Sequence, residues 1–181
     1  SLRKTGITSG VEITTMGDIP TEGSGLGSSS TVTVGALHAM YAYRKELISA
    51  EHLAREACDI EINILGSPIG IQDQYIAAYG GINCFEFLKN GSVVATPLAI
   101  SEETLFNLED NLLLFFTGYA RSASTILKEQ DTKSRSADMD ITKNLHFIKE
   151  LGLSSKRALE EREPANLPPR WCYVGLSRHP R

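Results

Sequence analysis

Residues Val11 to Met16 alternate between apolar and polar side chains and include β-branched residues, a pattern that predicts a β-strand. A glycine-rich loop follows, from Gly17 to Gly27. Between Ser28 and about Lys45, apolar residues recur every three or four positions, which predicts a helix. The residues expected on its buried face are Val34, Leu37, Met40 and Tyr41.

Two further helices are predicted after this one. Ser49 can cap the N-terminus of the first, which runs from Ala50 to about Leu65. The segment Gly66 to Gly70 ends it, and a short helix from Ile71 to Tyr79 follows. The apolar stripe of the longer helix consists of Leu53, Ala57, Ile60 and Ile64.

The chain continues with a predicted β-hairpin. Residues 82–88 and 92–97 flank Asn90-Gly91, and Asn-Gly favours a tight turn between antiparallel strands. The remaining predicted elements are a buried central strand over residues 111–117 and helices over residues 123–129 and 139–161. Because strands and helices occur in mixed order, the pattern predicts an α+β fold of packed layers.

Composition and charge narrow the possible functions. Of the 181 residues, 41% are hydrophobic and 22% are charged, as in ordinary soluble globular domains. The net charge of −4 provides no basic field for nucleic acid or acidic lipid, and no apolar run approaches the ~20 residues that span a bilayer. The odd set of cysteines (Cys58, Cys84 and Cys172) favours reduced thiols. We therefore expect a cytoplasmic protein that binds neither nucleic acid nor membrane, and the sequence leaves the oligomeric state open.

The loop before the first long helix has the composition of an anion-binding site. Its glycines allow successive backbone N–H groups to converge on an anion. The N-terminus of the following helix adds free N–H groups and the positive end of its dipole, and serine hydroxyls there can donate hydrogen bonds or bind a metal ion. This chemistry suits a polyphosphate. The candidate binding residues are Gly23, Ser24, Gly25, Leu26, Gly27, Ser28, Ser29 and Ser30.

Other interpretations of this loop can be compared with that one. A Walker A loop requires Gly-Lys-Ser/Thr, and no lysine occurs between Gly17 and Arg44. A dinucleotide-binding fingerprint requires a third glycine where Ser28 stands. A plain structural interpretation, a flexible linker followed by a serine-capped helix, stays open on the pattern alone.

Two carboxylates follow the loop at positions where a metal-dependent phosphoryl transfer would use them. Glu61 borders the apolar stripe of its helix, where burial of a carboxylate is costly unless a partner or a metal compensates it. The alternative is a side chain at the edge of that face that extends to water. Asp73 stands at the start of a short helix, and its alternative is an ordinary acid stabilised by the helix dipole.

The residues Pro20…Gly25-Leu-Gly-Ser-Ser-Ser30 resemble the second signature motif of the GHMP kinases, the galacto-, homoserine, mevalonate and phosphomevalonate kinases. The resemblance implies that this loop surrounds the phosphates of ATP and that Ser29 helps to hold Mg²⁺. Galactokinase-like members carry an Asp-Gln pair at a similar distance from a metal-binding Glu. The resemblance therefore implies that Asp73 is the catalytic base and that Glu61 is a Mg²⁺ ligand.

Within this family, residues 60–83 and 116–124 resemble bacterial kinases of D-glycero-D-manno-heptose 7-phosphate, which phosphorylate the anomeric hydroxyl of the sugar. The resemblance thus implies an ATP-dependent sugar kinase whose ligands are ATP, Mg²⁺ and a sugar phosphate. Family members that act on galactose, fucose or mevalonate share much of the pattern and remain alternatives. The residues that the resemblance places near the sugar are Gln74, Tyr79, Gly80, Arg121 and Ser122.

The resemblance also implies the fold and its division. Residues 1–108 would form part of an N-terminal ATP-binding half of the ribosomal protein S5 domain 2-like type, and residues 109–163 would begin the C-terminal α+β half. After Glu163 the composition changes, and residues 164–181 are expected to form an atypical, disordered tail.

The first and third signature motifs of the family are not found in the sequence, so we expect a fragment with weak or no turnover alone. Two other function classes are an inactive nucleotide- or anion-binding module and a scaffold whose motif match is accidental. The presence of both Glu61 and Asp73 argues against each, because neither class needs the two carboxylates.

Overall fold

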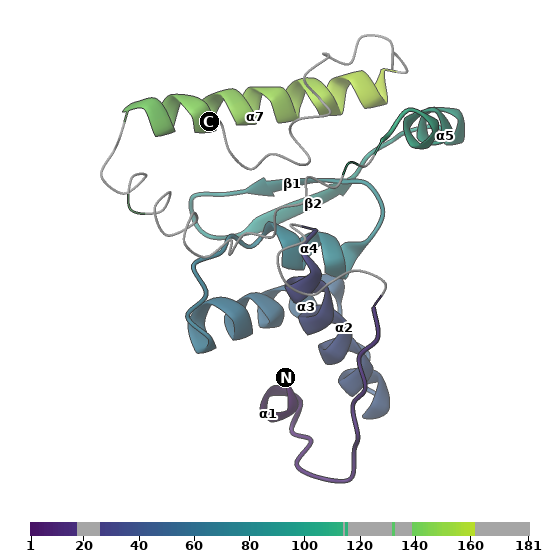
Figure 1. The fold of residues 1–181 in the computed structure, drawn as a ribbon, viewed down its shortest axis with the longest axis vertical. Coiled ribbons are helices and arrows are strands. Elements are labelled where there is room, and N and C mark those ends of the chain that lie inside the picture. Colours follow the sequence, from purple (N-terminus) through teal and green to yellow (C-terminus); the bar gives the residue numbers. More distant parts are fainter. Residues whose placement is uncertain (18–25, 114, 116–131, 133–138, 162–181) are drawn as a thin grey trace. The chain divides into compact units, whose positions relative to one another are not determined.

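The structure, a computed structural model, describes residues 1–17, 26–113, 115, 132 and 139–161. These residues belong to two units, the first ending at Gly81 and the second beginning at Ile82. The first unit contains α1 (Leu2–Thr5), α2 (Ser28–Tyr43), α3 (Ala50–Cys58), η1 (Asp59–Ile64) and α4 (Gln72–Tyr79) (Figure 1). The second contains β1 (Asn83–Phe87), β2 (Val93–Pro97), α5 (Glu102–Asp110) and α7 (Met139–Glu160).

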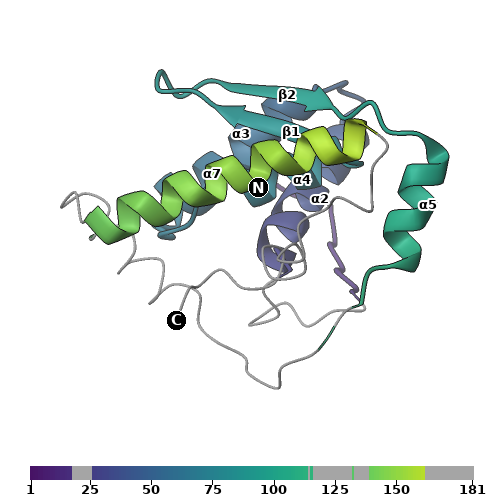
Figure 2. The same cartoon turned by 90° about the horizontal axis from the view of Figure 1, so that it is seen from above.

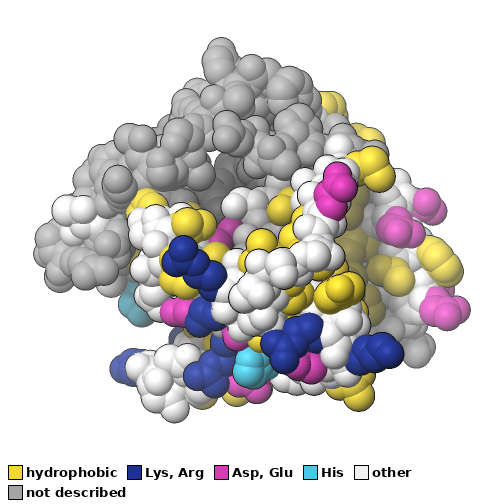
Figure 3. All heavy atoms as spheres, turned by 90° about the horizontal axis from the view of Figure 1, so that it is seen from below, with side chains coloured by type: hydrophobic (Ala, Val, Ile, Leu, Met, Phe, Trp, Pro, Cys, Tyr) yellow, Lys and Arg dark blue, Asp and Glu magenta, His cyan; other side chains and the backbone are white. Residues whose placement is uncertain are grey.

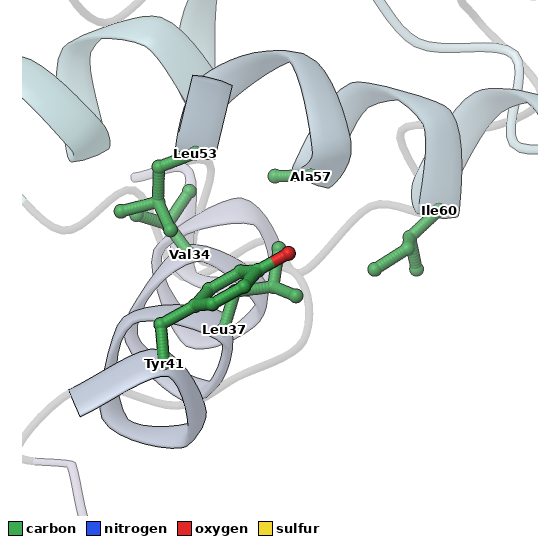
Figure 4. Packing of buried hydrophobic residues seen from close by; sticks show 6 residues of the cluster. All are labelled: Val34, Leu37, Tyr41, Leu53, Ala57 and Ile60. Atoms are coloured by element: carbon green, nitrogen blue, oxygen red, sulfur yellow. The ribbon is translucent and has the colours of Figure 1, made fainter. Parts of the chain in front are cut away.

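The core of the first unit lies between α2 and the continuous helix formed by α3 and η1. Side chains of the two helices point toward one another there, as Figure 4 shows. Full burial of one of them, Leu37, contributes about 1.5–3 kcal/mol through the hydrophobic effect. Helix α4 contacts both α2 and α3. The buried cluster consists of Val34, Leu37, Tyr41, Leu53, Ala57 and Ile60. The predicted buried face of α2 is thereby confirmed, with Met40 also buried.

Helix α3 changes its winding where it continues into η1. Ser49 caps α3 with its side chain, as predicted. In η1 the Leu65 N–H donates to the Ile60 carbonyl at 2.9 Å, and this spacing of five residues marks a π-helical turn. The wider turn changes which side chains face inward. Ile64 is 61% exposed, so its predicted place in the apolar stripe is wrong, whereas Glu61 is turned into the core and is 2% exposed.

The segment between α1 and the glycine loop does not form the strand predicted over residues 11–16. A strand is held by hydrogen bonds to a neighbouring strand, and the described residues supply none beside this segment. Two of its apolar side chains, Ile13 and Met16, are 48% and 95% exposed. Helix α1, which the pattern did not predict, ends at Gly6 in the left-handed conformation (φ 69°).

The β-hairpin is confirmed in position and pairing. Strands β1 and β2 are antiparallel, with Asn83 opposite Pro97, and the ribbon turns back sharply between them (Figure 2). Gly91 takes the left-handed φ of 83° that the tight turn requires. The Asn90 side chain accepts the Ser92 N–H at 3.0 Å and fixes the same turn. Helices together with this antiparallel sheet make the fold α+β.

The rest of the second unit departs further from the predictions. Helix α7 matches the predicted long helix, but α5, whose N-terminus Ser101 caps, was not predicted. The described residues of the predicted strand at 111–117 form no strand, and Leu112, Leu113 and Phe115 are exposed. That prediction is wrong for these residues. A buried strand needs neighbours on both sides, and in the described part of the chain β1 and β2 pair only with each other. The predicted helix at 123–129 and the tail at 164–181 lie outside the described residues.

Charges of both signs occur together on the surface, and Figure 3 shows basic and acidic side chains intermixed on one face. In the first unit, ion pairs join Lys4 to Asp59 at 2.6 Å and Arg55 to Glu51 at 3.7 Å. The hydrogen bond from Lys4 holds the pKa of Asp59 below its ordinary value. None of the described helices has the length and hydrophobicity needed to cross a membrane.

Candidate active site

The carboxylate of Glu61 is the centre of a buried polar cluster in the first unit. Glu61 is carried by η1, and hydroxyl groups from the first turns of α2 donate to it. Ser29 Oγ donates to Oε1 and Ser30 Oγ to Oε2, both at 2.8 Å. Thr33 Oγ1 shares its proton between the Ser29 carbonyl at 3.1 Å and Oε1 at 3.3 Å. These hydrogen bonds compensate the carboxylate for its lost hydration. The alternative in which Glu61 extends to water is therefore wrong.

Ser29 and Ser30 precede Thr33 by four and three residues, and this spacing places all three hydroxyl groups on one side of α2. Thr33 was not among the predicted site residues, and this spacing is the signal that could have identified it. No described side chain caps α2, whose N-cap is Gly27. The alternative interpretation of the loop, as a linker before a helix capped by serine, is therefore wrong about the cap. The hydroxyl groups of Ser29 and Ser30 donate to Glu61 instead.

Gln74 completes the polar cluster from the side of α4. Its side chain is 0% exposed, and its Nε2 donates to Oε2 of Glu61. Its Oε1 has no hydrogen-bond partner among the described residues. The resemblance placed Gln74 near the sugar, but in the structure its amide is directed at the carboxylate of Glu61.

Asp73 lies beside the N-terminus of α2. It is half-buried in the first turn of α4, and a Cβ atom added at Gly27 would stand 3.4 Å from its Cγ. Gly27 also has φ 71°, a left-handed conformation that other residues rarely adopt. The end of the glycine loop thus lies close to Asp73, while serines in the first turn of α2 hold Glu61. The role of Asp73 as an ordinary acid at a helix N-terminus stays open on this geometry.

Cys58 lies next to the cluster, at the end of α3. Its Sγ is 3.9 Å from the carbonyl oxygen of Ile71, just before α4. Burial raises the pKa of the Cys58 thiol to about 11, and the negative charge of Glu61 acts in the same direction. Such a thiol stays protonated near neutral pH, so it packs as a neutral group and is a poor nucleophile.

The other predicted site residues are distributed around this cluster. Ser28 is the first residue of α2, directly after Leu26 and Gly27. Tyr79 closes α4 and stacks on Tyr75 with ring centroids 6.2 Å apart, about 9 Å along the helix from Asp73. Gly80, with φ 64°, ends that helix. The predicted residues Gly23, Ser24, Gly25, Arg121 and Ser122 lie outside the described residues.

The oxygen atoms of Ser29 and Glu61 suit a magnesium ion. Mg²⁺ prefers oxygen ligands at about 2.1 Å in an octahedron, where neighbouring ligand oxygens are about 3 Å apart. Ser29 Oγ and Glu61 Oε1 are 2.8 Å apart. Within the described ranges, no group of three or more His, Cys, Asp and Glu side chains could hold a metal. Ser29 and Glu61 could supply two oxygen ligands to such an ion, with phosphate oxygens and water as the others.

Comparison with known proteins places this site in a family. The family model of the GHMP kinases N-terminal domain matches residues 1–81, which include the whole polar cluster. The chain is 37% identical over 145 residues to the D-glycero-alpha-D-manno-heptose 7-phosphate kinase of Campylobacter jejuni, covering 80% of this chain and 42% of that protein. It is 29% identical over 152 residues to a bifunctional fucokinase/GDP-fucose pyrophosphorylase of Arabidopsis thaliana, covering 83% of this chain and 14% of that protein.

A solved structure supports the same relationship. The crystal structure of a D-glycero-D-manno-heptose 1-phosphate kinase from Bacteriodes thetaiotaomicron superposes with a TM-score of 0.64 at 33% identity, covering 81% of this chain and 40% of that one. The chain therefore spans less than half the length of the relatives that it matches. Sequence and fold agree over the helices that build the site, and residues 1–81 of the chain match the N-terminal domain of the GHMP kinases.

Proposed function

We propose that the chain is the nucleotide-binding part of an ATP-dependent sugar kinase, and that the whole kinase transfers the γ-phosphate to the anomeric hydroxyl of D-glycero-D-manno-heptose 7-phosphate. The observation that carries this proposal is the hydrogen bond between Ser29 and the buried carboxylate of Glu61. It joins the end of a predicted phosphate loop to a buried acid at a spacing that suits Mg²⁺. A binding module without chemistry would have no use for Asp73 beside that loop.

The proposed roles follow from the needs of phosphoryl transfer, which depends mainly on positioning and charge stabilisation. The loop from Gly23 to Ser30 would hold the phosphates of ATP, through backbone N–H groups and the N-terminus of α2. Ser29 and Glu61 would hold Mg²⁺, which neutralises charge on the phosphates when it is bound. Asp73 would orient the sugar hydroxyl and accept its proton.

The sugar is inferred from the relatives, because two of those described above are kinases of a heptose phosphate. A fucokinase among the relatives keeps other sugars as candidates. The residues proposed to contact the sugar are Tyr79, Gly80, Arg121 and Ser122. Cytoplasmic location and the absence of nucleic-acid and membrane partners remain predictions from composition.

The test of this function is a substitution at Asp73 in a chain extended to the full length of its relatives. Asp73→Asn keeps the size of the side chain but removes its basicity, so kcat should fall by about 10²–10⁴-fold while ATP affinity is unchanged. Phosphorus NMR of ATP and D-glycero-D-manno-heptose 7-phosphate would follow the formation of the anomeric phosphate. The matched control, Asp110→Asn on the exposed surface of α5, should leave kcat unchanged.

Three outcomes of this test are informative. Unchanged turnover in Asp73→Asn would mean that transfer proceeds without a base at this position. Tight ATP binding with no turnover on the heptose phosphate, galactose, fucose or mevalonate would favour a nucleotide-binding module. Preference for one of the other acceptors would keep the kinase but replace the sugar.

A further inference from the structure

We propose that Gln74 is a positioning residue that fixes the carboxylate of Glu61 in the orientation needed for Mg²⁺. Its hydrogen bond to Glu61 also connects α4, the helix that carries Asp73, to the proposed metal site. The proposal rests on the proposed function, and it assigns Gln74 to the metal side of the site, away from the sugar.

The hydrogen bonds to Glu61 come from two directions. From α2, Ser29 and Thr33 reach Oε1 and Ser30 reaches Oε2. From α4, Gln74 reaches Oε2 alone. The carboxylate group is therefore held from two helices rather than one. The added donor from α4 limits the tilt and displacement of the carboxylate plane, so that one of its oxygens stays beside Ser29, where the ion would bind.

The orientation of the Gln74 amide is determined by this contact. If the amide were turned over, its oxygen would face the carboxylate oxygen, and two acceptors would repel each other. With the NH₂ group toward Glu61, the amide oxygen is left buried without a partner among the described residues. Buried polar atoms without a partner are rare in folded proteins. The hydrogen bond to Glu61 therefore decides which end of the amide faces the carboxylate, although it leaves the amide oxygen without a partner among the described residues.

Gln74 also connects the two carboxylates of the site. It follows Asp73 directly in α4, and Asp73 stands against Gly27 at the N-cap of α2. Consecutive residues of α4 therefore lie close to the end of the phosphate loop and donate to the proposed metal ligand. Partners of a metal-ligating side chain typically change metal affinity or activity by about 10–100-fold when they are removed. The same range is expected for Gln74.

The first experiment measures metal-dependent nucleotide binding by the 181-residue chain. The probe is the fluorescent analogue mant-ATP, titrated in MnCl₂ and again in EDTA. Gln74→Met keeps the length of the side chain and removes the donor. It should weaken binding in MnCl₂ by about 10–100-fold and leave binding in EDTA unchanged. The matched control is Gln72→Met, since Gln72 is exposed on the same helix, and it should behave as the wild type.

A double-mutant cycle separates positioning from a general structural effect. If Gln74 acts through Glu61, then Gln74→Met should have no further effect on binding in MnCl₂ once Glu61→Gln is present. A side chain that merely supports the fold would weaken binding by the same factor in both backgrounds. It would also weaken binding in EDTA. Either of these results would overturn the proposal.

The remaining outcomes are also decisive. If the wild-type chain binds mant-ATP no better in MnCl₂ than in EDTA, the proposed function is wrong, and the inference about Gln74 is wrong as well. If the wild type shows the metal effect and Gln74→Met retains it, only the role of Gln74 is wrong. Should Gln74→Met fail to fold, Gln74→Asn, which keeps the amide but withdraws it from Glu61, should show the same metal-specific loss, and normal binding in that variant would overturn the proposal.

Discussion

The two units of the chain differ in what they bury. In the first unit, α2, α3, η1 and α4 enclose a hydrophobic cluster and, beside it, the carboxylate of Glu61 with its donors. In the second, Thr104 and Leu159 are the buried residues among those described, and the apolar side chains of α7 are largely exposed. A buried carboxylate with several donors is kept in place only by well-packed surroundings. The contrast indicates that the first unit contains most of the buried core of the described structure, together with the polar cluster around Glu61.

The division into two units also agrees with the extent of the match to the family. The family model ends at residue 81, the boundary of the first unit. The polar cluster lies wholly inside that boundary. Variants that compare the two units can therefore show whether stability and nucleotide binding are properties of the same helices.

The largest expected effect comes from the core of the first unit. Leu37→Ala should lower the free energy of unfolding by about 2–5 kcal/mol, because it removes a fully buried side chain and leaves a cavity. Phe147→Ala on α7 should change it by less than about 0.5 kcal/mol, since Phe147 is exposed. Urea denaturation followed by circular dichroism measures both. Equal losses would show that the second unit is packed more tightly than its described surface indicates.

A smaller effect is expected at two glycines that share a left-handed backbone. Gly27→Ala and Gly91→Ala should each destabilise the chain by about 1–2 kcal/mol, because φ is 71° at Gly27 and 83° at Gly91. Only Gly27→Ala should also weaken mant-ATP binding, since its methyl group would stand against Asp73. Nothing lies within 4 Å of a Cβ at Gly91. Weaker binding in both variants would mean that the loss follows from reduced stability.

The smallest expected effect concerns the thiol of Cys58. In a chain with Cys84→Ser and Cys172→Ser, alkylation of Cys58 by iodoacetamide should be slow at pH 8 and should accelerate as the pH approaches about 11. The thiolate is the reactive form, and burial raises the pKa of this thiol. Adding Glu61→Gln should lower that pKa and speed the reaction at pH 8, whereas Glu51→Gln should not. An unchanged rate in Glu61→Gln would indicate that the charge of Glu61 does not reach Cys58.

Helices and the hairpin could be predicted from sequence because their signals are local. The spacing of Val34, Leu37 and Tyr41 is sufficient to define a buried face, and Asn90-Gly91 is sufficient to predict the turn. The strand expected at residues 11–16 could not be tested by pattern alone, because a strand depends on neighbours distant in sequence.

The candidate site shows the same limit. Family resemblance pointed to Ser29, Glu61 and Asp73, and the structure brings Ser29 and Glu61 into contact. The inward turn of Glu61 depends on the π-helical winding of η1, for which the sequence carries no simple signal. The direction of the Gln74 amide depends on the packing of three helices. Such tertiary contacts decide orientation, and orientation decides the role of a polar side chain.

The central claim is that Ser29 and Glu61 form the metal-binding side of a nucleotide site. Its most direct test is isothermal titration of the chain with ATP, in excess Mg²⁺ and in EDTA, for the wild type, Glu61→Gln and the matched surface variant Glu51→Gln. Mg²⁺ should tighten ATP binding in the wild type and in Glu51→Gln, and this gain should be lost in Glu61→Gln while binding in EDTA is retained. A full Mg²⁺ effect in Glu61→Gln would show that Glu61 does not bind the metal ion.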